Sequence, residues 1–197
     1  SDLYPFKPEE KIIEYAIAAR MPKKKRLIDM TVREFVHETA SESPAPGGGS
    51  IAATLGALGA ALATMVANLS AHKRGWDKRW EEFSNWAEKG KKFHDDLLQL
   101  IDEDTDAFNR LMDAFGLPNG SVEEKSARRQ AIQSATKGAM EIPLRVMQVT
   151  VESMEVIAAM ADIGNPNSAS DAGVAALCAR SAVIGAHLNV KINAKGL

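Results

Sequence analysis

The chain has 197 residues, a length that fits one domain able to bury its own core. Its 24 Lys and Arg side chains nearly balance 26 Asp and Glu, and a net charge of −2 gives no field that would attract nucleic acid or an acidic membrane. The single cysteine, Cys178, excludes a disulfide within the chain and suits a cytoplasmic location.

Residues 1–25 are predicted to form a lead-in segment, separate from the rest of the chain. The opening stretch "SDLYPFKPEEKIIEYAI" is charged and lacks the apolar centre of a signal peptide, so we expect no export. Because the chain begins with Ser and not Met, we expect a processed product or a piece of a larger protein. Next along the chain, Thr31 and Glu34 have the spacing of a capping box and predict a short helix ending near Ala40.

The stretch "SPAPGGGSIAATLGALGAALATMVANLS", residues 43–70, places three glycines before a run of small apolar residues without a charge. It is long enough to span a bilayer, but Ala, Gly, Thr and Ser gain little from lipid. No second span is expected in a chain of mean hydropathy −0.19, and we expect no membrane association. Small residues at every fourth position favour close backbone contact with another helix, of this chain or of a second copy. They are Ala52, Gly56, Ala60 and Thr64.

Apolar residues recur every three or four positions between residues 76 and 115 and predict one long helix. Asp104 falls on its apolar face with Leu97, whereas Asp102 and Asp106 fall on the solvent side. A buried carboxylate is costly unless it is paired or used, and burial raises its pKa towards values suited to proton transfer. Asp104 is therefore a candidate acid–base group, and the alternative is a structural hydrogen bond to another helix.

A second long helix is opened by the capping box of Ser121 and Glu124, and Pro143 is expected to kink it. The turn-rich loop "GNPNSAS" follows, and Ser168 or Ser170 is expected to cap a last apolar helix. No segment alternates with period two for long enough to predict a strand. The predicted fold class is an all-α helical bundle with two long helices and roughly five or six helices in total.

Two of the candidate groups lie at predicted helix starts. The amides of Gly48, Gly49 and Ser50 either hold a carboxylate or form only a tight turn. A nucleotide-binding loop is excluded because no Lys follows the glycines and no strand precedes them. Asp171 lies three residues after Ser168, so it either completes a helix cap or belongs to a site.

Three asparagines are further candidates. Asn189 and Asn193 are one turn apart on an apolar helix and point the same way, so as buried amides they need partners. Asn165 precedes a proline in the loop, where Asn is ordinarily a turn former. The four histidines share no metal-ligand spacing, and we expect no metal site.

Three segments closely resemble the formimidoyltetrahydrofolate cyclodeaminase and methenyltetrahydrofolate cyclohydrolase family, in the right order and from about Leu27 onward. They are the glycine-containing stretch above, "LIDEDTDAFNRLMDAFGLP" and "GNPNSASDAGVAALCARSAVIGAHLNVKIN". The lead-in "FKPEEKIIEYAI" also resembles the segment joining transferase to deaminase in bifunctional members, which favours a cyclodeaminase. Family members usually continue past "LNVKIN" into another helix, so the domain, placed at residues 26–197, is expected to be truncated at its C-terminal edge.

The resemblance implies an all-α cytoplasmic homodimer of one-carbon metabolism and histidine degradation, with folate bound near the subunit interface. It implies conversion of 5-formimidoyltetrahydrofolate to 5,10-methenyltetrahydrofolate and ammonia. We expect no cofactor beyond the tetrahydrofolate substrate, which is either polyglutamylated or not. We also expect a formimidoyltransferase domain or partner. The alternatives are a methenyltetrahydrofolate cyclohydrolase and a catalytically silent folate-binding or dimerising module.

Ammonia release requires a group that gives and takes protons near neutral pH. We assign this role to Asp104, with Asp171 as the second candidate. The glycine loop and the asparagines are assigned to folate binding, and two basic residues that match basic positions in the family are assigned to its glutamate tail. These substrate-binding residues are Gly48, Gly49, Ser50, Lys73, Arg74, Asn165, Asn189 and Asn193.

Overall fold

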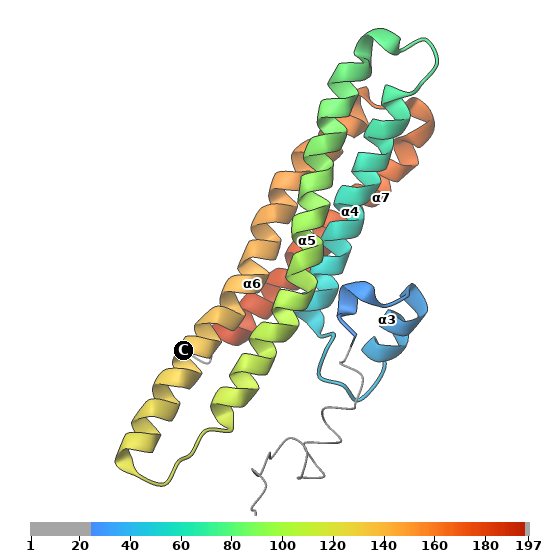
Figure 1. Ribbon diagram of the computed structural model, residues 1–197. Coiled ribbons are helices and arrows are strands. Elements are labelled where there is room, and N and C mark those ends of the chain that lie inside the picture. The colour runs from blue at the N-terminus through green and yellow to red at the C-terminus, as the bar shows by residue number, and fades with distance from the viewer. Residues whose placement is uncertain (1–24, 196–197) are drawn as a thin grey trace, which may run out of the picture.

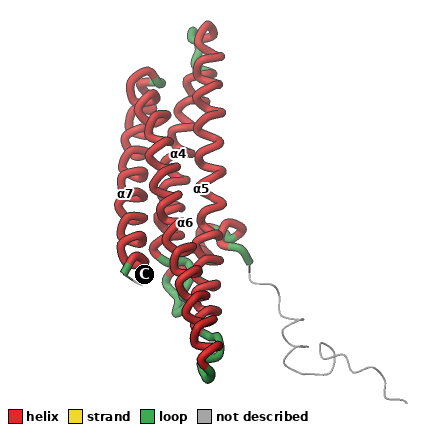
Figure 2. Tube along the Cα trace, turned by 90° about the vertical axis from the view of Figure 1, so that its left-hand side faces the viewer, coloured by secondary structure: helices red, strands yellow, loops and turns green. Residues whose placement is uncertain are grey.

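The protein is an elongated bundle of helices (Figures 1 and 2). The structure, a computed structural model, describes residues 25–195, and the lead-in predicted for residues 1–25 lies almost wholly outside that range. The described residues form only helices and short 3-10 turns, which confirms the predicted all-α class. The α-helices are α3 (Val32–Thr39), α4 (Gly48–Ala71), α5 (Trp80–Phe115), α6 (Val122–Ile163) and α7 (Ala169–Ala194), and the turns are Leu27–Asp29, Asp77–Arg79 and Pro166–Ser168.

Side-chain caps determine where α3 and α6 begin. Thr31 and Ser121 each accept a hydrogen bond from the backbone N–H of a glutamate three residues later, Glu34 and Glu124 respectively. Each glutamate in turn accepts the N–H of the capping residue, so both predicted capping boxes are confirmed. Helix α7 begins directly after Ser168 as predicted, but the Ser168 side chain makes no capping hydrogen bond.

The two long helices differ in how closely they follow the prediction. The helix expected from Trp76 begins only at Trp80, after a 3-10 turn. Trp76 still packs on the helix, because its ring stacks on Phe83 with the ring centroids 5.4 Å apart, and this contact explains its place in the apolar pattern. Helix α6 runs without a break through Pro143, and the kink expected there stays a prediction.

Helix α4 is the centre of the bundle and contacts α5, α6 and α7. Its small side chains permit this close packing: a Cβ on Gly59 would lie 3.0 Å from the carbonyl oxygen of Ala175 on α7. The predicted stripe of small residues is buried inside this chain, so it serves contacts between helices of one copy. The stripe consists of Ala52, Gly56, Ala60 and Thr64.

Helix α7 lies on one side of the bundle (Figure 2). Its small residues are buried against the bundle, and its large apolar residues are exposed. The inward residues are Ala172, Ala175, Ala179, Ala182 and Ala186. The outward residues, each 48–61% exposed, are Val174, Leu177, Ile184, Leu188 and Ile192.

Two described segments are long and apolar enough to cross a membrane by length and composition alone, α4 and Pro166–Ala194. The expectation that the chain has no second such segment is therefore wrong. The most apolar window of α4 is 61% buried in the bundle, whereas that of Pro166–Ala194 is only 22% buried. Burial in the core of this chain thus accounts for the apolar composition of α4, but it does not account for that of α7.

The hairpin of α5 and α6 extends past the first turn of α4 (Figure 1). The apolar stripe of α5 leaves the core along this hairpin, because Leu97 and Ile101 are buried, Phe108 and Leu111 are half-buried, and the stripe ends exposed. Asp104 lies where the stripe leaves the core.

Packing around Gly56 gives a test of the α4 interface. A Cβ on Gly56 would lie 2.7 Å from Oγ1 of Thr150 and 3.2 Å from a methyl carbon of Leu97. Gly56→Leu should therefore lower the free energy of unfolding by about 1–3 kcal/mol through overpacking, as measured by denaturant titration. In the control Gly138→Ala, the new Cβ meets nothing within 4 Å, and stability should rise by about 0.5–1 kcal/mol. Unchanged stability of Gly56→Leu would contradict the close packing of α4.

Candidate active site

Asp104, on α5, lies against the first turn of α4. The hydroxyl of Ser50 donates a hydrogen bond of 2.9 Å to Oδ2 of Asp104. A Cβ on Gly49 would overlap Oδ1 of the same carboxylate. The glycine at position 49 therefore provides the space in which the carboxylate sits.

The start of α4 explains why a carboxylate is favourable there. The capping position is Gly47, which has no side chain to accept the N–H groups that a helix leaves unpaired at its first turn. A carboxylate from another helix can accept them, and the positive end of the helix dipole favours its negative charge. Asp104 therefore makes the hydrogen bond to another helix that the structural alternative predicted. The same carboxylate also lies at the uncapped start of α4, where an anion is favourable.

The ionisation of Asp104 is set by two opposing effects. Burial raises the pKa of Asp104 above its ordinary value of 3.8, and this is the larger effect. Hydrogen bonds from the side chain and the backbone of Ser50 favour the charged form and lower the pKa. A carboxyl group balanced in this way can both take up and release a proton closer to neutral pH than an exposed aspartate.

Asp104 lines a pocket of about 250 Å³ at the end of the bundle where α4 begins. Among the residues that line it, Asp104 is the one with an ionisable side chain. The lining residues are Pro44, Ala45, Gly47, Gly48, Gly49, Asp104, Thr105, Phe108, Leu111, Ala139, Asn189 and Asn193.

Asn189 and Asn193, from α7, form part of the same lining, as their spacing predicted. The side-chain NH₂ of Asn193 donates to the carbonyl oxygen of Ala139 at 2.8 Å, and that of Asn189 donates to the carbonyl oxygen of Gly185 at 2.9 Å. No donor among the described residues reaches either side-chain oxygen. Both amides are therefore fixed by the backbone and retain an acceptor for a ligand.

The other predicted site residues lie at the opposite end of α4, which is about 36 Å long. The N–H of Asn165 donates to Oγ of Ser70, in the last turn of α4, at 2.8 Å. Asp171 is in the first turn of α7 near this end. Lys73 and Arg74 follow the end of α4, and Nζ of Lys73 lies 4.0 Å from the ring centroid of Trp76. Within one chain, the structure therefore separates these four residues from Asp104.

The solvent-side prediction for Asp102 is wrong, since this residue is only 8% exposed. Its Oδ1 accepts the backbone N–H of Leu27 at 2.8 Å, and its Oδ2 accepts Nε–H of Arg26 at 3.2 Å. The segment before α3 covers this face of α5. A helical wheel cannot anticipate that contact, because it comes from a part of the chain 75 residues away.

Several pocket residues were not predicted from the sequence. Phe108 and Leu111 belong to the apolar stripe of α5, which the periodicity assigns to the core. The signal that could have placed them in a pocket is Asp104, which lies on the same stripe. Thr105 has a buried hydroxyl with no hydrogen-bond partner in residues 25–195, and it is adjacent to Asp104. Ala139, on α6, carried no signal, because its place in the pocket depends on how α6 packs.

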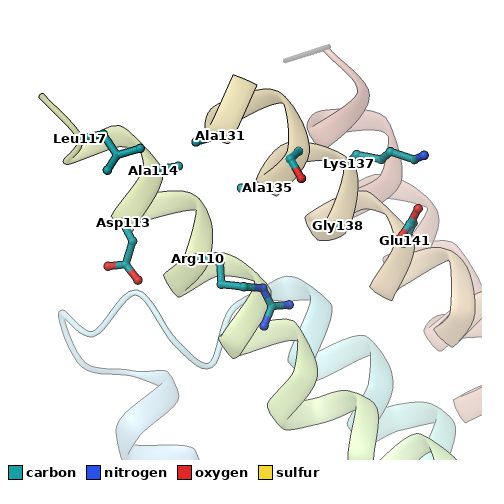
Figure 3. Close-up of a pocket in the computed structure, with 10 residues that line it drawn as sticks. Arg110, Asp113, Ala114, Leu117, Ala131, Ala135, Lys137, Gly138 and Glu141 are labelled. Carbon is teal, nitrogen blue, oxygen red and sulfur yellow. The ribbon is translucent and has the colours of Figure 1, made fainter. Parts of the chain in front are cut away.

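A larger hollow of about 710 Å³ lies between the projecting ends of α5 and α6 (Figure 3). Arg110 and Asp113 come from α5, Lys137 and Glu141 from α6, and small alanines lie between the helices (Figure 3). Lys137 extends away from the hollow (Figure 3). Charges of both signs on an open surface provide no group held for catalysis, so the pocket at Asp104 is the better candidate.

Comparison with known proteins identifies the family. A sequence model of the formiminotransferase-cyclodeaminase family matches residues 31–197, most of the chain. The chain belongs to this family. The resemblance seen in the three sequence segments is thereby confirmed, and Asp104, the glycine loop and both C-terminal asparagines lie inside the matched region.

The relatives include enzymes with two related activities. The chain is 41% identical to a methenyltetrahydrofolate cyclohydrolase of Methylorubrum extorquens over 85% of this chain and 80% of that protein. It is 35% identical to the formimidoyltransferase-cyclodeaminase of Mus musculus over 99% of this chain, but spans only 36% of that longer protein. The crystal structure of a formiminotetrahydrofolate cyclodeaminase from Thermotoga maritima matches with a TM-score of 0.73 at 31% identity, over 84% of this chain and 79% of that one.

Removal of the Ser50 hydroxyl should change the ionisation of Asp104 in a defined direction. Ser50→Ala deletes a hydrogen bond that favours the charged carboxylate, so the pKa of Asp104 should rise further above 3.8. Carbon NMR titration of the aspartate carboxyls would measure this shift. Thr54→Ser is the control, because the Thr54 hydroxyl donates to the Ser50 carbonyl and the substitution keeps that donor. A lower or unchanged pKa in Ser50→Ala would contradict the geometry.

Proposed function

We propose that the chain is a formimidoyltetrahydrofolate cyclodeaminase that releases ammonia from 5-formimidoyltetrahydrofolate and forms 5,10-methenyltetrahydrofolate. The observation that carries the proposal is Asp104, a part-buried carboxyl with a raised pKa in a pocket that has no other ionisable side chain. The family membership of the chain and the names of its relatives supply the substrate class.

The reaction requires one proton to move between two nitrogens. N10 of the folate attacks the formimidoyl carbon on N5, a five-membered ring closes, and a tetrahedral carbon carrying an amino group results. N10 must lose its proton, and the amino nitrogen must gain one before the C–N bond breaks and ammonia leaves. The Asp104 carboxylate takes the proton from N10 and delivers it to the departing nitrogen, which leaves the carboxylate unchanged after each turnover.

The surrounding residues then have separate roles. Ser50 donates to Oδ2 of Asp104 and so fixes the carboxylate at the edge of the pocket. The side-chain oxygens of Asn189 and Asn193 accept N–H groups of the pterin, and Phe108 provides an apolar wall for its ring. The backbone of the glycine loop lies close enough to Asp104 for the substrate to contact both.

The extent of the similarity supports deaminase over hydrolase activity. The alignment with the mouse formimidoyltransferase-cyclodeaminase covers 195 residues of the chain, against 167 residues for the cyclohydrolase. The additional similarity agrees with the lead-in segment, which resembles the region that joins the two activities of the bifunctional proteins. A transferase domain or partner, a homodimeric state and a cytoplasmic role in histidine breakdown are parts of the same proposal.

Incubation with 5-formimidoyltetrahydrofolate would test the reaction. Ammonia and the absorbance of the methenyl product should appear together, in equal amounts and without added metal or nucleotide. Hydrolysis of methenyltetrahydrofolate by the same preparation should be slower. Faster hydrolysis than ammonia release would assign the chain to the cyclohydrolases, and no reaction with either substrate would favour a catalytically silent folate-binding module.

Asp104→Asn tests the proton carrier. The amide has nearly the same volume and still accepts the Ser50 hydroxyl, but it cannot exchange a proton at neutral pH, so kcat should fall by about 10²–10⁴-fold while the protein stays folded. Asp113→Asn, on the exposed side of α5, is the matched control and should retain its kcat. A near-normal rate with a lowered melting temperature in Asp104→Asn would reduce Asp104 to a structural partner of Ser50.

A further inference from the structure

Thr105, on α5, has a hydroxyl that differs from those of most other threonines in the helices. A threonine inside a helix can donate its hydroxyl to the backbone carbonyl oxygen one turn earlier. In the described helices this bond, 2.7–2.8 Å long, is present at Thr39, Thr54, Thr64 and Thr136. The hydroxyl of Thr105 is buried, and it has neither this bond nor any other partner in residues 25–195.

Thr150, on α6, also has a buried hydroxyl without a partner among the described residues, but its surroundings are different. The residue is fully buried in the core, and a Cβ on Gly56 of α4 would lie 2.7 Å from its hydroxyl oxygen. Packing between α4 and α6 therefore encloses this group. Thr105 instead lines two hollows.

Thr105 and Ala45 form the wall between these two hollows, because both residues line each of them. The first hollow is the pocket of about 250 Å³ that contains Asp104, and the second has a volume of about 240 Å³. The polar residues that line only the second are Lys25, Arg26, Asp102, Asp106 and Asn109. Both of its cations are already paired with carboxylates of this chain. The proposed chemistry takes place in the first hollow, so that is where an unpaired hydroxyl has a use.

We propose that Thr105 is a substrate-positioning residue whose hydroxyl turns into the Asp104 pocket and accepts an N–H of the departing nitrogen. A threonine in a helix has two accessible χ1 rotamers, and no hydrogen bond holds the Thr105 hydroxyl in its present position. Turning towards the substrate therefore breaks no bond within the described part of the chain. This inference rests on the proposed function and assigns a second contact to the nitrogen that Asp104 protonates.

The chemistry of ammonia release explains what this contact does. The amino group on the tetrahedral carbon has two N–H donors and one lone pair, and the lone pair must point at the Asp104 carboxyl to receive the proton. Asp104 and Thr105 are consecutive residues on α5, so their side chains leave the helix about 100° apart and reach the nitrogen from two directions. An N–H donated to Thr105 fixes rotation about the C–N bond and directs the lone pair towards Asp104.

The contact becomes stronger as the reaction proceeds. When the amino nitrogen gains its proton it becomes a cation, and a hydrogen bond from a charged donor is stronger than one from a neutral donor. An interaction that strengthens on the way to the transition state raises kcat, whereas one that is equally strong throughout lowers only KM. The Thr105 oxygen therefore acts on the step in which the C–N bond breaks.

The other neutral polar side chains of the pocket have different tasks. Asn189 and Asn193 donate their side-chain NH₂ groups to backbone carbonyl oxygens, and their oxygens are assigned to the pterin. Thr105 carries the one hydroxyl among the residues that line the pocket. It is thus the neutral side chain left to accept the departing nitrogen.

The energetics of an unpaired hydroxyl separate this role from a structural one. A buried hydroxyl without a partner lowers stability, because it loses its hydrogen bonds to water and gains none in return. An apolar group of the same shape removes that cost. A hydroxyl that stabilises the fold and a hydroxyl reserved for the substrate therefore predict opposite changes in stability when it is deleted.

Thr105→Val tests the inference, because valine keeps the branched shape and lacks the hydroxyl. The melting temperature should rise by about 2–4 °C. The kcat for ammonia release from 5-formimidoyltetrahydrofolate should fall by about 10–10²-fold, with little change in KM, because the lost bond is one to a charged group of the transition state. Thr105→Ser keeps the hydroxyl and should retain most of the wild-type kcat.

Thr64→Val is the matched control. The Thr64 hydroxyl donates to the carbonyl oxygen of Ala60 at 2.8 Å, and the residue lies about 22 Å along α4 from Gly49. Loss of this satisfied bond should lower the melting temperature by about 2–4 °C and leave kcat unchanged. The control and Thr105→Val thus differ in both measurements.

Three results would overturn the inference. They are a lowered melting temperature in Thr105→Val, a kcat of that variant near the wild-type value, and a Thr105→Ser variant as slow as Thr105→Val. The proposed function stands in each case as long as Asp104→Asn is inactive. Full activity of Asp104→Asn would instead refute the proposed function and this contact with it.

Discussion

The contact between Asp104 and the first turn of α4 is the constraint on which the site depends. The carboxylate occupies the volume that any side chain at position 49 would need, and Ser50 donates to it from the next residue. An anion at this place supplies an acceptor to a helix start that has no capping side chain. The same contact holds a part-buried acid with a raised pKa at the edge of the core. The contact between Ser50 and Asp104 thus stabilises the start of α4 and also positions the acid proposed to carry the proton.

The small residues of α4 and α7 allow the helices of the bundle to pack closely around α4. Because α4 has almost no large side chain facing inward, α5, α6 and α7 all approach its backbone, and Gly59 lies in near contact with Ala175. The alanines of α7 face inward for the same reason, which leaves its large residues, such as Leu177, on the outside. A core built from small residues therefore leaves large apolar side chains exposed on the outer face of α7.

The sequence predicted the features that depend on local spacing. The capping boxes at Thr31 and Ser121 and the placement of Asp104 on the apolar face of α5 follow from periodicity, and the motifs identified the family. The sequence did not predict the contacts between segments that are far apart along the chain. Asp102 is covered by a segment 75 residues away, and the distance between Asp171 and Asp104 depends on the length of α4. Spacing along one helix carries no information on which segment packs against it.

The central claim is that one part-buried carboxyl carries the proton during ammonia release. The pH dependence of kcat/KM for 5-formimidoyltetrahydrofolate tests it most directly, because this quantity reports ionisations of the free enzyme. The account predicts that kcat/KM falls as the pH drops through a single pKa above 3.8, equal to the pKa of the Asp104 carboxyl measured by NMR in the same protein. A kcat/KM that stays constant while Asp104 becomes protonated would contradict it.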